Sequence, residues 1–167
     1  MTYVHKEVVT STQTELLTYM DDFPHLTILS AGYQTEGHGQ FDRTWESSAN
    51  QNILCSILVK HISMSRLAEV QKEVSIVIVN YLKKWLYQTT FKEPNDILIN
   101  GKKIGGVIVE SKTKGNNVIG AVIGFGLNIN QTTFHYKNAT SLHIETQQVF
   151  DLKTIEREII ELIIALF

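Results

Sequence analysis

The chain has 167 residues, 43% of them hydrophobic and 19% charged, so it is long enough to bury a core and too apolar to be disordered. Its 15 lysines and arginines nearly balance 17 aspartates and glutamates, which leaves no charge excess for nucleic acid to bind. No apolar run approaches the roughly 20 residues of a membrane span, and the N-terminus lacks the apolar core of a signal peptide. We therefore expect one cytoplasmic domain over residues 1–167, with neither nucleic acid nor a membrane as a partner.

The first third of the chain predicts three strands, one short helix and a loop. Residues 3–9 predict a strand, and residues 12–15 have the sequence of a capping box, which opens a short helix. Residues 26–33 predict a second strand, and residues 51–61 predict a third. Between these two strands, residues 34–47 are polar and contain glycines, which is typical either of a surface loop or of a loop that closes over a ligand.

A long amphipathic helix is predicted after the third strand. Its apolar residues recur at spacings of three and four over about five turns, and they are Leu67, Val70, Val74, Val77, Ile78, Tyr81 and Trp85. Such a helix packs its apolar face across a sheet. Within the third strand, Cys55 is expected to be a buried structural thiol, and the 6 histidines have no zinc-site spacing.

A β-hairpin is the strongest local prediction. An Asn-Gly pair at positions 100–101 lies between two runs rich in Ile, Leu and Val, and these two residue types tolerate the positive φ of a two-residue turn. The resulting register pairs Leu98 with Lys103 and Asp96 with Gly105. Residues 118–130 predict a further strand after a turn at residues 115–117, and residues 152–167 predict a last amphipathic helix.

The faces of this hairpin are both largely apolar. One face is predicted to carry Asp96, Leu98, Lys103, Gly105 and Val107, and the other Asn95, Ile97, Ile99, Ile104, Gly106 and Ile108. A buried ammonium at Lys103 needs a negative partner, either Asp96 or a bound anionic ligand. Spacing alone favours a structural ion pair, whereas the adjacent glycines indicate a bulge or a ligand that approaches the backbone closely.

The strand at residues 118–130 is predicted to have one face lined by glycine. Alternation places Gly120, Val122, Gly124, Gly126, Asn128 and Asn130 on this face, and Ile119, Ala121, Ile123, Phe125, Leu127 and Ile129 on the other. A face without side chains leaves room for a ligand. The Gly-Phe-Gly run at 124–126 is not a dinucleotide-binding fingerprint, because no third glycine and no helix follow it.

Several of these segments resemble motifs of the biotin protein ligases. Residues 94–96 (Pro-Asn-Asp) and 103–110 are similar to the signature hairpin of that family, except that the family usually has Trp where this chain has Glu93. Residues 34–47 resemble its adenylate-binding loop, with His38 and Gln40 in place of two arginines. The matching positions in this loop are Gln34, Thr35, Gly37, Gly39, Arg43, Trp45 and Ser47.

Three shorter matches extend the resemblance over nearly the whole chain. Ser11-Thr12-Gln13 matches a triplet that hydrogen-bonds the biotin ureido ring, residues 124–130 match a motif near the adenine and ribose, and residues 140–142 match a short Thr-Ser-Leu segment. The resemblance implies an α/β fold of the class II aminoacyl-tRNA synthetase and biotin ligase type, with a mixed, mostly antiparallel sheet and helices on one face. It also implies a catalytic domain only, with no N-terminal DNA-binding domain and no C-terminal SH3-like domain.

The activity implied by the resemblance has two steps. ATP activates biotin to biotinyl-5′-AMP with Mg²⁺ as cofactor, and biotin is then transferred to a lysine of a biotin carboxyl carrier protein, in acetyl-CoA carboxylase or another biotin-dependent carboxylase. Sheet-edge homodimers are common in the family. The implied catalytic residues are Lys103, Asp96 and Arg43, with Asp96 also the Mg²⁺ ligand. The implied biotin-binding residues are Ser11, Thr12, Gln13, Gln34, Gly37, His38, Lys103, Gly105 and Gly106. The implied ATP- or adenylate-binding residues are Gly39, Gln40, Arg43, Trp45, Asn95, Asn128 and Asn130.

Two alternatives stay open at this point. One is a lipoate or octanoate ligase or transferase of the same superfamily, although the Arg-Arg-x-Ser-Gly-Gly-Gly segment of lipoate ligases is absent from the sequence. The other is a binding module that holds biotin or its adenylate without catalysis. His38, Gln40 and Glu93 favour the second alternative, because each departs from the ligase motifs.

Overall fold

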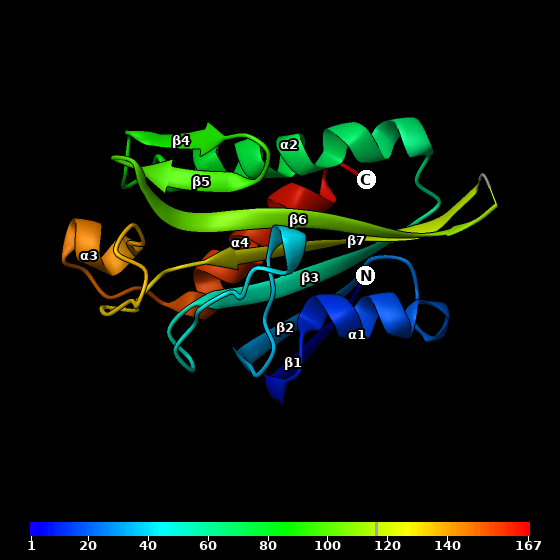
Figure 1. Ribbon diagram of the computed structural model, residues 1–167, viewed down its shortest axis with the longest axis horizontal. Coiled ribbons are helices and arrows are strands. Elements are labelled where there is room, and N and C mark those ends of the chain that lie inside the picture. Colours follow the sequence, from blue (N-terminus) through cyan, green and yellow to red (C-terminus); the bar gives the residue numbers. More distant parts are fainter. Residues whose placement is uncertain (116) are drawn as a thin grey trace.

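The computed structural model describes residues 1–115 and 117–167, without the side chain of Asp42. Asn116, in the predicted turn at 115–117, lies outside the described residues. One sheet of seven strands forms in the order β1-β2-β3-β7-β6-β5-β4 (Figure 1). The strands are β1 (Thr2–Val9), β2 (Thr27–Gln34), β3 (Ile53–Lys60), β4 (Thr89–Lys92), β5 (Asp96–Ile99), β6 (Lys102–Lys114) and β7 (Asn117–Leu127). β1 and β2 are parallel and all other neighbouring strands are antiparallel, which confirms the predicted mixed, mostly antiparallel sheet.

Two long helices cover one face of the sheet, and a short helix covers part of the other (Figure 1). The long helices are α2 (Met64–Leu82) and α4 (Leu152–Ile164), and the short ones are α1 (Thr12–Thr18) and α3 (Leu142–Thr146), with two 3₁₀ turns at Met20–Asp22 and Gln40–Asp42. Val74 and Ile78 of α2 and Ile159 of α4 are fully buried in the larger core. The prediction placed helices on one face only, and the structure adds α1 on the other face.

The smaller core, on the α1 side, explains where α1 lies. Leu16 and Met20 pack there against Leu29, Leu58 and Val122 from three neighbouring strands. Full burial of an aliphatic side chain contributes roughly 1.5–3 kcal/mol, so this contact suffices to seat a helix of two turns. The smaller core fills only part of that face, and Gly124 and Gly126 of β7 lie beyond it.

The start of α1 differs from the prediction by one residue. Ser11, not Thr12, is the N-cap, and its side-chain oxygen accepts a hydrogen bond from the backbone N–H of Thr14. With Ser11 as N-cap, the N3 position of a capping box is Thr14 rather than Glu15, and Glu15 instead forms an ion pair with Lys6 of β1. Thr12 and Gln13 are therefore free to face the sheet rather than the helix end.

The register of the β5–β6 hairpin also corrects the prediction. Leu98 faces Lys103 as expected, but Asp96 faces Gly106 rather than Gly105, because a bulge inserts Ile104 between the two pairings. From Gly105 onward, the residues of β6 therefore lie, relative to Lys103, on the opposite face to the one that was predicted. Gly105 joins Ile104 on the core side, and Gly106 lies on the same side as Lys103.

A second bulge, in β7, corrects the predicted position of Ile119. Lys112 pairs with Gly120 and Thr113 with Val118, so Ile119 is the additional residue on its strand. It packs with the smaller core, not on the face of Ala121 and Ile123 as alternation predicted. From Gly120 to Leu127 the predicted alternation is confirmed, but β7 ends at Leu127 rather than Asn130, and the Asn130 side chain bonds the backbone of Phe150 instead of facing the cavity. Among the described residues, no helix is both long and apolar enough to cross a membrane.

Candidate active site

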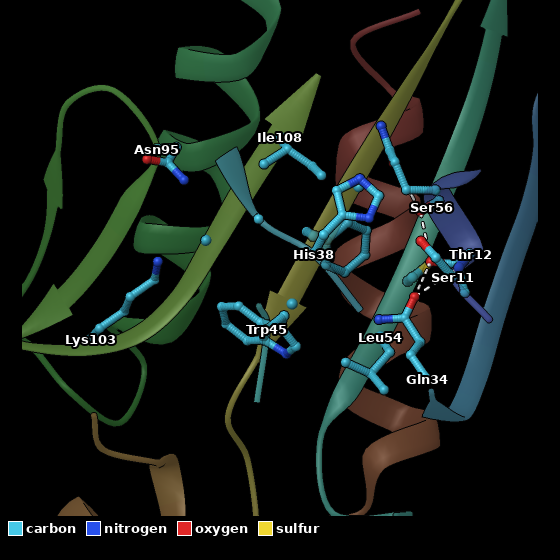
Figure 2. A pocket seen from close by; sticks show the side chains of 17 residues that line it. Ser11, Thr12, Gln34, His38, Trp45, Leu54, Ser56, Asn95, Lys103 and Ile108 are labelled. Carbon is cyan, nitrogen blue, oxygen red and sulfur yellow. Dashed lines mark hydrogen bonds between the residues drawn. The ribbon is translucent and has the colours of Figure 1, made fainter. Parts of the chain in front are cut away.

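A cavity of about 440 Å³, including space open to solvent, lies over the glycine-lined face of β6 and β7. The start of α1 and the end of β2 form one side, and the loop of residues 35–48 covers it (Figure 2). Its lining joins residues far apart in the sequence, and they are Ser11, Thr12, Gln13, Gln34, His38, Gly39, Trp45, Leu54, Cys55, Ser56, Asn95, Lys103, Gly106, Ile108, Gly124, Phe125 and Gly126.

One end of the cavity is a neutral hydrogen-bonded network. Gln34 Oε1 accepts hydrogen bonds from the backbone N–H of Thr12 at 2.7 Å and from Thr12 Oγ1 at 3.0 Å. Thr12 Oγ1 lies 2.8 Å from Ser56 Oγ, and Ser56 donates to Gln13 Oε1 at 3.1 Å. Gln13 Nε2 donates to the carbonyl of Val122 at 2.9 Å. These hydroxyl and amide groups are held in fixed orientations, which suits recognition of an uncharged polar group.

The glycines of β7 make room for this network and for an aromatic side chain. A Cβ at position 124 would collide with Gln13 Oε1, and a Cβ at position 126 would lie 2.6 Å from Cε2 of Trp45. The predicted glycine-lined face therefore has a specific use. Its flat surface lets Gln13 and Trp45 lie directly on the strand.

The opposite end of the cavity carries the charge. Lys103 Nζ lies 2.6 Å from Asp96 Oδ1 and 5.5 Å from the centre of the Trp45 ring, within the range of a cation–π contact. Figure 2 shows Lys103 and Asn95 on one side of Trp45 and the hydroxyl network on the other. The side chain of Lys103 is 35% exposed, so its ammonium is available to an anion that enters the cavity.

The backbone around Lys103 is fixed by a segment that follows β7. Lys103 N donates to the carbonyl of Asn138 at 2.7 Å, and Thr140 N donates to the carbonyl of Lys103 at 2.9 Å. Asn128 is buried beside this contact and donates from Nδ2 to the carbonyl of Thr140 at 3.0 Å. The Oδ1 of Asn128 is also buried and has no hydrogen-bond partner within the described residues.

The loop over the cavity is itself a small hairpin. Trp45 N donates to the carbonyl of Gly37 at 2.9 Å, and His38 pairs with Thr44. Gly37 is buried against Gln34, where an added Cβ would lie 2.9 Å from its Nε2. His38 Nε2 lies 3.5 Å from Glu110 Oε2 of β6, a contact across the mouth of the cavity.

Ten of the predicted site residues line the cavity, and they are Ser11, Thr12, Gln13, Gln34, His38, Gly39, Trp45, Asn95, Lys103 and Gly106. Asp96 and Gly37 lie directly behind this lining. The other five predicted residues do not line the cavity, and they are Gln40, Arg43, Gly105, Asn128 and Asn130. Gly105 faces the core, where a Cβ would collide with Leu127, and Arg43 is exposed at the outer end of the loop. The side-chain amide of Asn130 is used to bind both backbone groups of Phe150.

Ser56, Leu54 and Ile108 line the cavity but were not predicted. The sequence carries a signal for Ser56, because it is a polar residue within an apolar strand. In the structure it is only 1% exposed. Cys55 contributes at the wall. Burial, with a smaller contribution from Glu156, raises the pKa of its thiol well above the ordinary value, so Cys55 stays protonated at neutral pH and is unsuited to nucleophilic chemistry.

The residues present do not form a metal site by themselves. No group of three or more His, Cys, Asp or Glu side chains with suitable spacing occurs in the described part of the chain. The carboxylate of Asp96 is already engaged by Lys103. Mg²⁺ usually keeps several waters and takes only one or two protein carboxylates, so a single carboxylate such as Asp96 would not define a site alone.

Comparison with solved structures defines the class of fold. The structure of a biotin protein ligase from Aquifex aeolicus in complex with biotin and ATP is similar with a TM-score of 0.81 and 24% identity, over 97% of this chain and 68% of that one. A biotin protein ligase from Leishmania major in complex with biotinyl-5-AMP is similar with a TM-score of 0.80 and 22% identity, over 97% and 73% of the two chains. The fold is that of the biotin protein ligases.

The sequence comparisons identify the family. A family model described as the biotin/lipoate A/B protein ligase family matches residues 6–128. The chain belongs to this family. The bifunctional ligase/repressor BirA of Bacillus spizizenii is 31% identical over 131 residues, and that of Bacillus subtilis is 30% identical over the same length. The match covers 77% of this chain but only 40% of either relative. The resemblance found from the motifs is thereby confirmed.

Proposed function

We propose that this protein activates biotin with ATP and transfers it to a lysine of a biotin carboxyl carrier protein. In the first step a biotin carboxylate oxygen attacks the α-phosphorus, the bond to pyrophosphate breaks, and biotinyl-5′-AMP forms. In the second step the neutral lysine amine attacks the acyl carbon, AMP leaves, and the amine loses a proton. The observation that carries the proposal is one cavity with a neutral network at one end and Lys103 at the other.

Lys103 draws the two anions of the first step together. Its ammonium offsets the charge of the carboxylate and of the α-phosphate as the new bond forms, which lowers the barrier electrostatically. Asp96, 2.6 Å away, holds the ammonium in place. In the second step Asp96 is also the carboxylate nearest to Lys103 and suited to accept the proton of the incoming amine.

The neutral network binds the polar ring of biotin. Gln34, Thr12 and Ser56 present hydroxyl and amide groups in fixed positions, and Gly106 leaves the floor of the cavity free of a side chain for the bicyclic ring. The loop carries the adenylate contacts, through Gly39, which lines the cavity, and the adjoining Gln40, with Asn128 near the base. Trp45 covers the cavity and excludes water, since hydrolysis of the anhydride competes with transfer.

Transfer to the carrier tests the proposal. The protein is incubated with biotin, ATP, Mg²⁺ and a biotin carboxyl carrier protein, and the mass of the carrier is followed. We expect the carrier to gain one biotinyl group, and a carrier whose acceptor lysine is replaced by arginine to gain none. Modification with lipoate or octanoate but not with biotin would overturn the proposal in favour of the neighbouring acyl ligases. Biotin binding without modification would indicate a binding module.

A further inference from the structure

The loop over the cavity is fastened at its outer end by one carboxylate. Glu46, which is 20% exposed, accepts hydrogen bonds from the backbone N–H of His135 at 3.0 Å and 3.1 Å, through its two carboxylate oxygens. His135 Nδ1 lies 2.8 Å from Oε1, and the backbone N–H of Tyr136 is near enough to help lower the pKa of the same carboxylate. One side chain of the loop therefore serves as a cap for the turn at residues 135–136.

A buried pair of amides supports this contact from below. Asn52 Nδ2 donates to Gln131 Oε1 at 2.5 Å, and the same oxygen accepts from the backbone N–H of Ser48 at 2.9 Å. Asn52 Oδ1 accepts from the backbone N–H of Ile129 at 3.0 Å. Asn52 and Gln131 are 4% and 3% exposed, so the pair is a fixed base. The end of the loop and residues 129–136 are thus joined at two levels.

The position of Glu46 links this fastening to the chemistry. It directly follows Trp45, whose indole lies on Gly126 and near the ammonium of Lys103. The segment that Glu46 caps continues to Asn138 and Thr140, which hold the backbone of Lys103. The Glu46 contact therefore connects the loop that carries Trp45 to the segment that holds the backbone of Lys103.

We propose that Glu46 is a positioning residue, which clamps the loop to residues 135–136 so that Trp45 stays closed over Lys103 and the activated intermediate. This inference deepens the proposed function and rests on it for the identity of the intermediate. The essential interaction is the acceptance of backbone N–H groups, not the ion pair. The His135 side chain is 95% exposed, and an ion pair with so exposed a partner contributes little.

The carboxylate is ionised at neutral pH, as the clamp requires. Burial alone would raise the pKa of Glu46. Hydrogen bonds from the His135 backbone and side chain, together with the His135 charge, outweigh burial and hold the pKa below its ordinary value. A charged acceptor makes stronger hydrogen bonds to backbone N–H groups than a neutral one.

The position of Trp45 is the first readout, and it needs no substrate. The protein has 2 tryptophans, and Trp85→Phe leaves Trp45 as the only one. We expect Glu46→Ala to raise acrylamide quenching of Trp45 fluorescence at least twofold. Glu46→Gln, which keeps an acceptor oxygen, should give an intermediate value. His135→Ala keeps the backbone donor, and Glu36→Ala removes an exposed acid from the same loop, so both should match the parent. Equal quenching in Glu46→Ala and the parent would overturn the proposal.

Retention of the intermediate is the second readout. We expect biotinyl-5′-AMP to be released several-fold faster from Glu46→Ala than from the parent and the Glu36→Ala control, with an unchanged KM for biotin. Unchanged release would overturn the clamp, as would a rise in the KM for biotin with no change in release. If the parent forms no adenylate, the proposed function fails, whereas the fluorescence measurement still decides on the clamp. Thermal unfolding of each variant checks that it is folded, and Glu46→Gln serves if Glu46→Ala is not.

Discussion

The two ends of the cavity are built in opposite ways. At the neutral end, Gln34, Thr12, Ser56 and Gln13 bind one another and the backbone, so each group is oriented before a ligand arrives. At the charged end, Lys103 pairs with Asp96 and keeps a partly exposed ammonium beside the Trp45 ring. The neutral end is suited to recognise a ring by shape and hydrogen bonds. The charged end is suited to chemistry, because its ammonium gains most when an anion forms there.

Removal of the Lys103 charge should have the largest effect, on the rate of adenylate formation. We expect Lys103→Ala to lower the rate of adenylate formation by about 10²-fold or more, because a fixed cation at the reacting anions is lost. Binding of biotin should change far less, since the neutral end is intact. Quenched-flow measurement of biotinyl-5′-AMP gives the rate. The neighbouring Lys102, which is exposed, provides the matched control as Lys102→Ala, and an equal loss in that variant would contradict the assignment.

The adjacent glycines of β6 lie on opposite faces of the strand, Gly105 toward the core and Gly106 toward the cavity. Gly105→Ala places a Cβ against Leu127 and 2.9 Å from the carbonyl of Gly126, so we expect a loss of roughly 1–3 kcal/mol in unfolding free energy. Gly106→Ala meets its nearest atom at 3.3 Å and points into the cavity, so it should weaken biotin binding with a smaller change in stability. Denaturant unfolding and calorimetric titration of both variants test this. The reverse pattern would show that the bulge is misplaced.

The contrast between Gly105 and Gly106 marks the limit of what the sequence predicts. Periodicity predicts α2, the Asn-Gly hairpin and the glycine-lined face of β7, because each depends on neighbours within a few residues. The bulge at Ile104 has only a weak local signal, and it decides which glycine faces the ligand. Ser56 meets Thr12 and Gln13 only in the folded sheet, across 44 and 43 residues. No local pattern predicts such a contact.

A cation added to the loop should slow the release of the intermediate from the charged end of the cavity. Where the resemblance leads us to expect arginines, this chain has His38 and Gln40, so it lacks two fixed cations beside the intermediate. We expect Gln40→Arg to slow the release of biotinyl-5′-AMP several-fold, since a guanidinium pairs with phosphate. The half-time of release from the loaded protein measures this. Gln88→Arg adds the same charge at an exposed position in the turn before β4 and should have no effect.

Removal of one hydroxyl group at the neutral end should weaken biotin binding by about the contribution of one hydrogen bond. Ser56→Ala removes the group between Thr12 and Gln13 and leaves Gln13 Oε1 short of a donor. We expect biotin binding to weaken by about 1–2 kcal/mol, with the rate of adenylate formation at saturating biotin almost unchanged. Titration calorimetry and single-turnover kinetics separate the two quantities. A lower rate with unchanged affinity would place Ser56 at the reacting atoms instead.

The smallest effect is expected on the far face of the sheet, where Glu156 of α4 is buried. Burial raises the pKa of Glu156, although hydrogen bonds from Tyr3 and Ser30 and the charge of His5 partly offset it. A carboxyl group with a raised pKa binds its proton more tightly when folded, so stability falls as pH rises from about 4.5 through the folded-state value. Glu156→Gln should flatten this slope in urea unfolding between pH 4 and pH 8. An unchanged slope would mean that another group titrates.

Exchange of labelled pyrophosphate into ATP tests the central claim most directly, because it reports the first half-reaction without a carrier protein. The reaction is run with Mg²⁺ and with biotin, lipoate or octanoate, and Lys103→Ala serves as the blank. We expect exchange with biotin alone in the parent protein and none in Lys103→Ala. Exchange only with lipoate or octanoate would contradict the assignment of the substrate. The absence of exchange from a protein that still binds biotin would contradict catalysis itself.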